Sequence, residues 1–167
     1  AGIARFLGEI GVAVPAVIGH DRERGFLIME DLGDVDLFAL RGASGGLRRG
    51  LYAKTLRLAA RLHAFPPDHL PADLRLMPGF GPELYRWEQD YFREQCVGKV
   101  CGIALSADEG KALESELAAL ARRLMETPSV LVHRDLQSQN VMVRNGEPFL
   151  IDFQGMRLGS AFYDLGS

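Results

Sequence analysis

Hydrophobic residues in the middle of the chain recur at a helical spacing. Within residues 47–65 they lie three, four or seven positions apart, which places them on one face of a helix. These residues are Leu51, Leu58, Leu62 and Phe65. Residues 82–97 and 108–126 show a similar pattern, and residues 3–10 are typical of the end of an amphipathic helix. The pattern therefore predicts a mainly helical central block.

Short apolar runs near the two ends of the chain predict strands instead. Residues 16–19 and 26–30 flank a polar, glycine-containing turn, which is typical of a hairpin. After Pro128 the period changes again, and the runs VLVH, NVMVR and PFLIDF predict three strands over 130–133, 140–144 and 148–153. Because the strands and helices are segregated along the chain rather than alternating, the predicted fold class is α+β.

Composition narrows the classes of function. A chain of 167 residues is the size of one ordinary domain, and 47% apolar with 25% charged residues is typical of a soluble globular protein. No apolar run approaches the roughly 18 residues that span a bilayer. A net charge of −3 argues against a nucleic-acid partner, whose backbone requires concentrated Lys and Arg. The only cysteines, Cys96 and Cys101, predict buried structural thiols in a reducing cytoplasm.

Three polar side chains follow the last predicted strands. Asp135 comes just after the strand over 130–133, Asn140 lies five residues further on, and Asp152 is near the end of the last strand. Any one of them alone would most often be a turn former or a helix cap. Together they suit phosphoryl transfer, because Mg²⁺ prefers hard oxygen ligands such as Asn140 and Asp152. Asp135 is then free to orient an attacking hydroxyl and accept its proton.

The order His-x-Asp-x-x-x-x-Asn, hairpin, apolar-apolar-Asp-Phe resembles the protein-kinase-like superfamily, and specifically its aminoglycoside phosphotransferase and choline kinase branch. FLIMEDLG resembles the last strand and hinge of the N-lobe, HRDLQSQN the catalytic loop, and IDFQG the metal-binding turn. The resemblance implies a remnant of the kinase N-lobe and hinge over residues 1–33. It implies a mainly helical C-lobe, incomplete at its C-terminus, over residues 34–167.

The resemblance also implies ATP and Mg²⁺ as cofactors and assigns roles to six residues. Asp135 would be the catalytic base, and Asn140 and Asp152 the metal ligands. Met29 would border the adenine pocket, while the backbone of Glu30 and Leu32 would hydrogen-bond the base. For Met29 a plain role in the strand core is an equally good interpretation, since recognition by backbone groups leaves little side-chain signature.

The spacing after the metal-binding turn favours a small-molecule acceptor over a protein. Asp164 resembles the aspartate at the start of the family's next helix, and it comes only twelve residues after Asp152. That leaves no room for the activation segment with which protein kinases hold a peptide. Gln137 and Gln154 also stand where protein kinases usually have the catalytic-loop Lys and the Gly of Asp-Phe-Gly.

The stretch LYRWEQDYFREQCV, residues 84–97, suggests which small molecule is the acceptor. Its aromatic and charged side chains look similar to the acceptor-side helix of bacterial kinases that phosphorylate N-acetylmuramate and N-acetylglucosamine at the anomeric hydroxyl. These side chains are Tyr85, Trp87, Glu88, Tyr91, Phe92 and Arg93. Aromatics at helical spacing are also typical of a core. An aminoglycoside or choline-type acceptor, and a catalytically impaired nucleotide-binding or scaffold domain, remain as alternatives.

Some parts of an ATP-dependent kinase are not visible in the sequence. Neither a glycine-rich hairpin nor a strand lysine paired with a helix glutamate precedes Gly11, and GASGGLRRG at 42–50 is interpreted as a flexible linker. We therefore expect further N- and C-terminal segments of the same protein, and weak ATP binding with little turnover from residues 1–167 alone. His63 is expected to be a hydrogen-bonded core histidine rather than a ligand.

Overall fold

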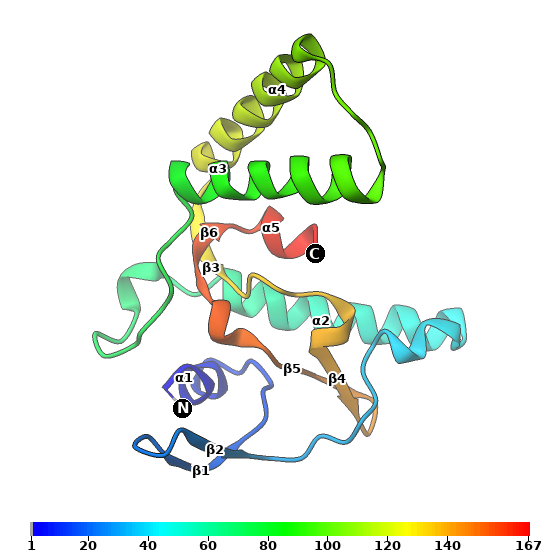
Figure 1. Ribbon diagram of the computed structural model, residues 1–167. Helices are drawn as coiled ribbons and strands as arrows, with labels where there is room; N and C mark the ends of the chain where they lie inside the picture. Colours follow the sequence, from blue (N-terminus) through cyan, green and yellow to red (C-terminus); the bar gives the residue numbers. More distant parts are fainter. Residues whose placement is uncertain (1) are drawn as a thin grey trace.

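The computed structural model describes residues 2–167, which form helices and three two-stranded antiparallel sheets (Figure 1). The α-helices are α1 Gly2–Glu9, α2 Gly45–His63, α3 Pro82–Tyr91, α4 Ala107–Glu126 and α5 Phe162–Leu165. The strands are β1 Val17–Asp21, β2 Phe26–Met29, β3 Ser129–Val132, β4 Val141–Arg144, β5 Glu147–Leu150 and β6 Arg157–Ser160. Short 3₁₀ turns cover η1 Ala39–Gly42, η2 Pro67–His69, η4 Ser138–Asn140 and η5 Phe153–Gly155, and η3 Phe92–Val100 is a π-helix. The α+β class is confirmed.

Two of the sheets are local hairpins and the third joins distant parts of the chain. β1 pairs with β2 and β4 with β5, whereas β3 pairs with β6 so that Val132 lies opposite Arg157. In Figure 1 the α3–α4 pair lies at one end of the molecule, α1 and the β1–β2 hairpin at the other, and α2 between them. The β3–β6 pair therefore brings the segment before the catalytic loop beside the segment after the metal-binding turn.

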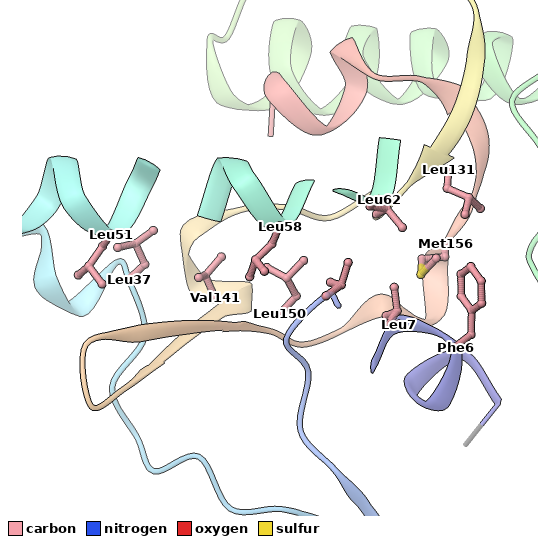
Figure 2. Close-up of a cluster of buried hydrophobic side chains, with 11 residues drawn as sticks. Phe6, Leu7, Leu37, Leu51, Leu58, Leu62, Leu131, Val141, Leu150 and Met156 are labelled. Atoms are coloured by element: carbon pink, nitrogen blue, oxygen red, sulfur yellow. The ribbon is translucent and has the colours of Figure 1, made fainter. Parts of the chain in front are cut away.

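The hydrophobic core lies where α2 packs against β3 and β5 and where α1 closes one side (Figure 2). Three of the four predicted α2 positions, Leu51, Leu58 and Leu62, are buried, and Phe65 packs at its edge with its ring at 90° to that of Phe6. The whole cluster consists of Phe6, Leu7, Val12, Leu37, Leu51, Leu58, Leu62, Leu131, Val141, Leu150 and Met156. Leu131, Val141 and Leu150 flank the predicted catalytic loop and the predicted metal-binding turn, so this core fixes the backbone on which the predicted site lies.

The structure corrects several predicted boundaries. The helix predicted over 82–97 is an α-helix only to Tyr91 and continues as the wider π-helix η3. The strand predicted over 148–153 stops at Leu150, because Asp152 adopts left-handed backbone angles (φ 58°, ψ 39°) that no strand accommodates. The glycine-rich linker is partly helical: the Ser44 side chain accepts a hydrogen bond from the Leu47 amide and caps α2.

Two further features differ from the sequence predictions or were not among them. Strand β6 was not predicted, because its run RLGS is short and mixed in polarity and owes its strand form to pairing with β3. The cysteines are free, but Cys101 is exposed and Cys96 only half-buried, so the prediction of buried thiols was wrong. Cys96 lies within the π-helix and Cys101 caps its C-terminal end, where the Cys101 amide donates to the Cys96 carbonyl. The division at residues 33 and 34 into N-lobe remnant and C-lobe stays a prediction.

One buried carboxylate joins three elements that are far apart in the sequence. Asp164 in α5 is 3% exposed and accepts hydrogen bonds from the backbone amides of His133 and Arg134, each at 2.8 Å. The Nε2 atom of His63, at the end of α2, lies 2.8 Å from the same carboxylate. The expectation that His63 is a hydrogen-bonded core histidine is confirmed. Asp164 thus fixes the start of the HRD loop against both α2 and α5.

Among residues 2–167 no helix is long and apolar enough to cross a membrane.

We expect Gly159→Ala to destabilise the fold. A Cβ atom at this buried position of β6 would lie 2.5 Å from the Phe80 ring, which is itself packed on Tyr163 with ring centroids 4.4 Å apart. Overpacking of this kind costs about 1–3 kcal/mol, measurable as a lower free energy of unfolding in urea. Gly50→Ala is the matched control, because nothing lies within 4 Å of it in exposed α2. Helix propensity predicts that the control gains about 0.5–1 kcal/mol. Equal stability of Gly159→Ala and the unsubstituted protein would contradict this packing.

We also expect Asp164→Asn to lower the free energy of unfolding by about 2–3 kcal/mol. The amide nitrogen of the new side chain would face one of the two backbone amides that Asp164 now accepts from, and this buried N–H would lose its acceptor. Urea unfolding measures the loss. Asp68→Asn is the matched control: its carboxylate also lies near a histidine, His69 at 4.0 Å, but its side chain is 82% exposed. The control should change stability by less than about 0.5 kcal/mol. A similar small change for Asp164→Asn would mean that the carboxylate does not secure the loop.

Candidate active site

The catalytic-loop segment begins where β3 ends. Val132 is fully buried in β3, and the chain then turns sharply because Arg134 has a positive φ of 86°, a left-handed conformation that is rare for a residue with a side chain. This turn is held by the two hydrogen bonds from the loop backbone to Asp164. Asp135 follows with a partly exposed carboxylate, its side chain 33% accessible. The loop therefore presents Asp135 at the surface of a rigid support.

Asn140 connects the two halves of the site. Its Nδ2 atom donates to the Asp135 carbonyl at 2.9 Å, and its own carbonyl accepts from the Ile151 amide at 3.0 Å. The first bond closes the loop between the predicted base and the predicted ligand, and the second fixes that loop to the residue before Asp152. The structure thus brings Asp135, Asn140 and Asp152 into one neighbourhood, as the sequence predicted.

The donor set at this place fits Mg²⁺. Asp152 is exposed, and its left-handed backbone turns the chain away from β5 immediately after the strand. Mg²⁺ is usually held by one or two protein oxygens, with water and phosphate oxygens completing its octahedron. In the part of the chain that the structure describes, no three His, Cys, Asp or Glu side chains gather as a metal site. The predicted ligands, Asn140 and Asp152, would provide one amide and one carboxylate oxygen, a number that Mg²⁺ commonly takes from a protein.

A cavity of about 820 Å³ lies beside the metal-binding turn, a size that accommodates a nucleotide. Met29 and Asp152 both line it, so the predicted adenine-bordering residue and a predicted metal ligand face the same space. Its other lining residues are Gly2, Ile3, Leu27, Asp73, Arg75, Phe153 and Gln154. The cavity lies between α1 and β2 on one side and η5 on the other. A nucleotide bound there would contact both the predicted hinge and the predicted metal-binding turn.

The predicted hinge is anchored by the Glu30 side chain. Its carboxylate pairs with Arg144 and accepts from the Ala16 amide, and these contacts lower the pKa of Glu30, the Ala16 bond most of all. The Glu30 amide donates to the Ala16 carbonyl, which continues the hairpin. Within residues 2–167, the Glu30 carbonyl and the Leu32 amide have no hydrogen-bond partner. These two groups are the ones predicted to bind the base.

Arg134 connects the predicted base to α3. One terminal nitrogen donates to Asp135 Oδ2 at 2.8 Å and the other lies 3.9 Å from Glu88 Oε1. The hydrogen bond to Asp135 raises the pKa of Arg134 above its ordinary value. The Tyr163 hydroxyl donates to Glu88 at 2.9 Å, and burial together with this carboxylate raises the pKa of Tyr163 to about 12. Two acids, one arginine and one phenol therefore form a single network next to the reacting position.

The aromatic side chains predicted to share one face of the helix over 82–97 lie in different environments. Tyr85 is buried against Phe80, and Trp87 and Tyr91 stack on each other at the surface with centroids 5.5 Å apart. Phe92 and Glu88 line an apolar cavity of about 360 Å³ that also touches Tyr163. Of the six predicted residues, Glu88 alone makes a hydrogen bond or ion pair to the network around Asp135.

The sequence did not identify three residues of this neighbourhood: the pairing of Arg134, the phenol of Tyr163 and the guanidinium of Arg157. Arg157 is 8% exposed, and its Nε atom donates to the Gly155 carbonyl at 3.0 Å. The sequence did contain a signal for Arg157, since it is the one charged residue in the run GMRLG and follows Asp152 by five residues. Its meaning depends on β6 pairing with β3, which the sequence pattern did not show.

His133 is the most deeply buried titratable group of the loop. It is 1% exposed, and neither ring nitrogen makes a hydrogen bond of ordinary geometry. Burial lowers the pKa of His133, because desolvation outweighs the opposing influence of the Asp164 carboxylate and of the Ile151 carbonyl. The imidazole is therefore neutral in the folded protein at neutral pH and acts as a core residue.

This lowered pKa predicts a pH dependence of stability. As the pH falls below about 6.5, unfolded chains protonate residue 133 while folded chains do not, so the free energy of unfolding falls by up to about 1.4 kcal/mol per pH unit. His133→Leu removes this contribution, so the difference between variant and unsubstituted protein should change between about pH 7.5 and 5.5. Urea unfolding across this range measures it. A difference that stays constant across this range would contradict the burial argument.

Comparison with known proteins gives three concordant results. The phosphotransferase enzyme family matches residues 1–167. The N-acetylmuramate/N-acetylglucosamine kinase of Pseudomonas putida is 28% identical over 163 residues, which is 98% of this chain and 46% of that protein. The protein of the same name from Pseudomonas aeruginosa is 27% identical over 170 residues, again 98% and 46%. The chain thus spans about half the length of these relatives.

Solved structures show the same fold. Aminoglycoside phosphotransferase APH(3'')-Id from Streptomyces rimosus, in complex with ADP and streptomycin, gives a TM-score of 0.65 at 17% identity, over 97% of this chain and 61% of that one. A variant of APH(4)-Ia in ternary complex with AMP-PNP and hygromycin B gives 0.63 at 21% identity, over 98% and 56%. These similarities confirm the protein-kinase-like fold. With the match over its full length, the chain belongs to the phosphotransferase enzyme family.

Proposed function

We propose that the protein carrying this chain transfers the γ-phosphoryl group of ATP to a hydroxyl of a small molecule, preferably an amino sugar or cell-wall sugar. The observation that supports this proposal best is the double role of Asn140, which bonds the Asp135 carbonyl and the Ile151 amide. A base and two oxygen ligands are thereby held on one short stretch of backbone. Phosphoryl transfer requires mainly such positioning, together with charge stabilisation.

In this proposal each residue of the site has a limited task. Asp135 accepts a hydrogen bond from the acceptor hydroxyl, orients it towards the phosphorus and takes its proton as the new bond forms. Asn140 and Asp152 hold Mg²⁺, which neutralises charge on the phosphate oxygens when bound. Arg134 keeps the Asp135 carboxylate in place by its 2.8 Å hydrogen bond. Asp164 keeps the backbone of the loop rigid during the reaction.

The nucleotide belongs in the 820 Å³ cavity beside Met29 and Asp152. The free carbonyl of Glu30 and the free amide of Leu32 offer an acceptor and a donor two residues apart, which suits the edge of an adenine base. Leu32 is 7% exposed, so its unpaired amide gains a partner when a base binds. A location in the cytoplasm, where ATP is supplied, is part of the proposal.

Two observations favour a sugar over a cationic aminoglycoside. The relatives with curated names are N-acetylmuramate/N-acetylglucosamine kinases. In addition, Arg134 lies within ion-pair distance of Asp135 and Glu88, and Arg157 adds a further positive charge nearby, so the space beside Asp135 is not the strongly acidic surface that a polycation requires. An impaired scaffold domain is less well supported, because a scaffold has no physical need for the convergence of Asp135, Asn140 and Asp152.

The direct test is a phosphate-transfer screen over amino sugars, aminoglycosides and choline-like alcohols. The protein used should be the complete product of the reading frame that encodes residues 1–167, assayed with Mg²⁺ and ATP. Transfer to an amino sugar or cell-wall sugar is the expected result. Transfer only to aminoglycosides, or nucleotide binding with no transfer to any acceptor, would replace this proposal with one of the alternatives.

We expect Asp135→Asn to lower kcat by about 10²–10⁴-fold, because the amide cannot take the proton. Binding of Mg²⁺·ATP should change little, since Asp135 is not a predicted metal ligand, whereas Asp152→Ala should weaken nucleotide binding in a Mg²⁺-dependent way. Kinetics and calorimetric titration measure the two effects. Asp108→Asn, at an exposed position in the first turn of α4, is the matched control and should leave both unchanged. Undiminished turnover by Asp135→Asn would remove this residue from its assigned role.

A further inference from the structure

Arg157 is a buried arginine whose guanidinium group makes one hydrogen bond to the described residues. Its guanidinium group lies over the Phe80 ring, with the guanidinium carbon 5.4 Å from the ring centroid, and its Nε atom donates to the Gly155 carbonyl. The two terminal nitrogens make no hydrogen bond to any residue from 2 to 167, and they are not among the fully enclosed unpaired atoms. The guanidinium group is therefore held in a fixed orientation, and its two terminal nitrogens remain accessible to solvent or to a ligand.

The neighbouring acids do not neutralise Arg157. Asp135 and Glu88 are both within ion-pair distance of Arg134, and Glu88 also accepts the Tyr163 hydroxyl. No carboxylate of the described residues lies within 4.0 Å of a nitrogen of Arg157. Burial, followed by the repulsion of Arg134, lowers the pKa of Arg157. Arg157 is thus a desolvated cation with vacant donors, a state that an anionic ligand would relieve.

The position of Gly155 connects Arg157 to the reacting centre. An added Cβ at Gly155 would lie 3.3 Å from Arg134 Cδ and 3.6 Å from Asp135 Oδ2. Gly155, whose carbonyl accepts the hydrogen bond from Arg157, therefore lies beside the predicted base, with room for no side chain larger than a methyl group between them. Because the acceptor hydroxyl must contact Asp135, other groups of the same small molecule come close to Arg157.

We infer that Arg157 determines acceptor specificity by binding a carboxylate of the acceptor, which makes a carboxylate-bearing sugar the preferred substrate. This inference rests on the proposed function. A planar guanidinium fork matches a carboxylate in two parallel hydrogen bonds, a geometry that an ammonium group cannot provide. N-acetylmuramate, named in the relatives, carries such a carboxylate on its lactyl ether, and N-acetylglucosamine does not. The two sugars therefore differ at the group that Arg157 would recognise.

The first experiment uses the unsubstituted protein and a matched pair of acceptors, N-acetylmuramate and its primary amide, which has nearly the same shape without the charge. We expect kcat/KM to be at least about tenfold higher for the acid, mainly through a lower KM, as a charge-assisted hydrogen-bonded pair predicts. Equal kcat/KM for acid and amide, or a preference for the amide, would overturn the inference. Phosphorylation of N-acetylglucosamine in the same assay tests the proposed function separately. If no sugar is phosphorylated, the proposed function fails, and with it the inference.

The second experiment assigns the preference to Arg157. Arg157→Gln should reduce the acid-to-amide ratio of kcat/KM to within about threefold of one, and Arg157→Lys should give an intermediate ratio because the charge remains without the fork. Arg48→Gln, at an exposed position of α2, is the matched control and should keep the ratio of the unsubstituted protein. Thermal melting establishes that each variant is folded before its ratio is interpreted. A folded Arg157→Gln protein that retains the full ratio would show that another group reads the carboxylate.

Discussion

The hydrogen bonds from the backbone of His133 and Arg134 to the buried carboxylate of Asp164 are the constraint on which the site depends. They hold Arg134 in a backbone conformation that a residue with a side chain rarely adopts, and such local strain persists only where the surroundings determine it. Since Asp164 belongs to α5 and also contacts His63 of α2, the geometry of the catalytic loop is set by elements about 30 and 70 residues away.

The charged groups around Asp135 differ in how many hydrogen-bond partners the protein itself provides for them. Asp164 has all its partners inside the protein, Arg134 is shared between Asp135 and Glu88, and Arg157 has only a backbone carbonyl. A buried ion is tolerable when its hydrogen bonds are complete and costly when they are not. The incompletely bonded group, Arg157, is held by Gly155 beside the predicted base, which is the distribution expected if ligand binding completes the network.

The sequence predicted those features that depend on local pattern. Helix α2, the strands around the catalytic loop, and the neighbourhood of Asp135, Asn140 and Asp152 follow from periodicity and motif spacing, and the structure agrees with them. It could not predict β6, because that strand exists only through its pairing with β3 across the fold. The contacts of Arg157, the sharing of Arg134 and the split of the α3 aromatics are likewise consequences of tertiary packing, which one sequence does not display.

The bond from Asn140 Nδ2 to the Asp135 carbonyl explains why an amide stands at this position rather than a stronger, charged ligand. An amide can serve two purposes with two atoms: its nitrogen closes the loop, while its oxygen remains available for the proposed coordination of Mg²⁺. An aspartate would turn an oxygen towards the Asp135 carbonyl and open the loop in order to add one negative charge. In the proposed site, an aspartate at position 140 would bind the cation more strongly than Asn140, but it would misalign the predicted base, Asp135.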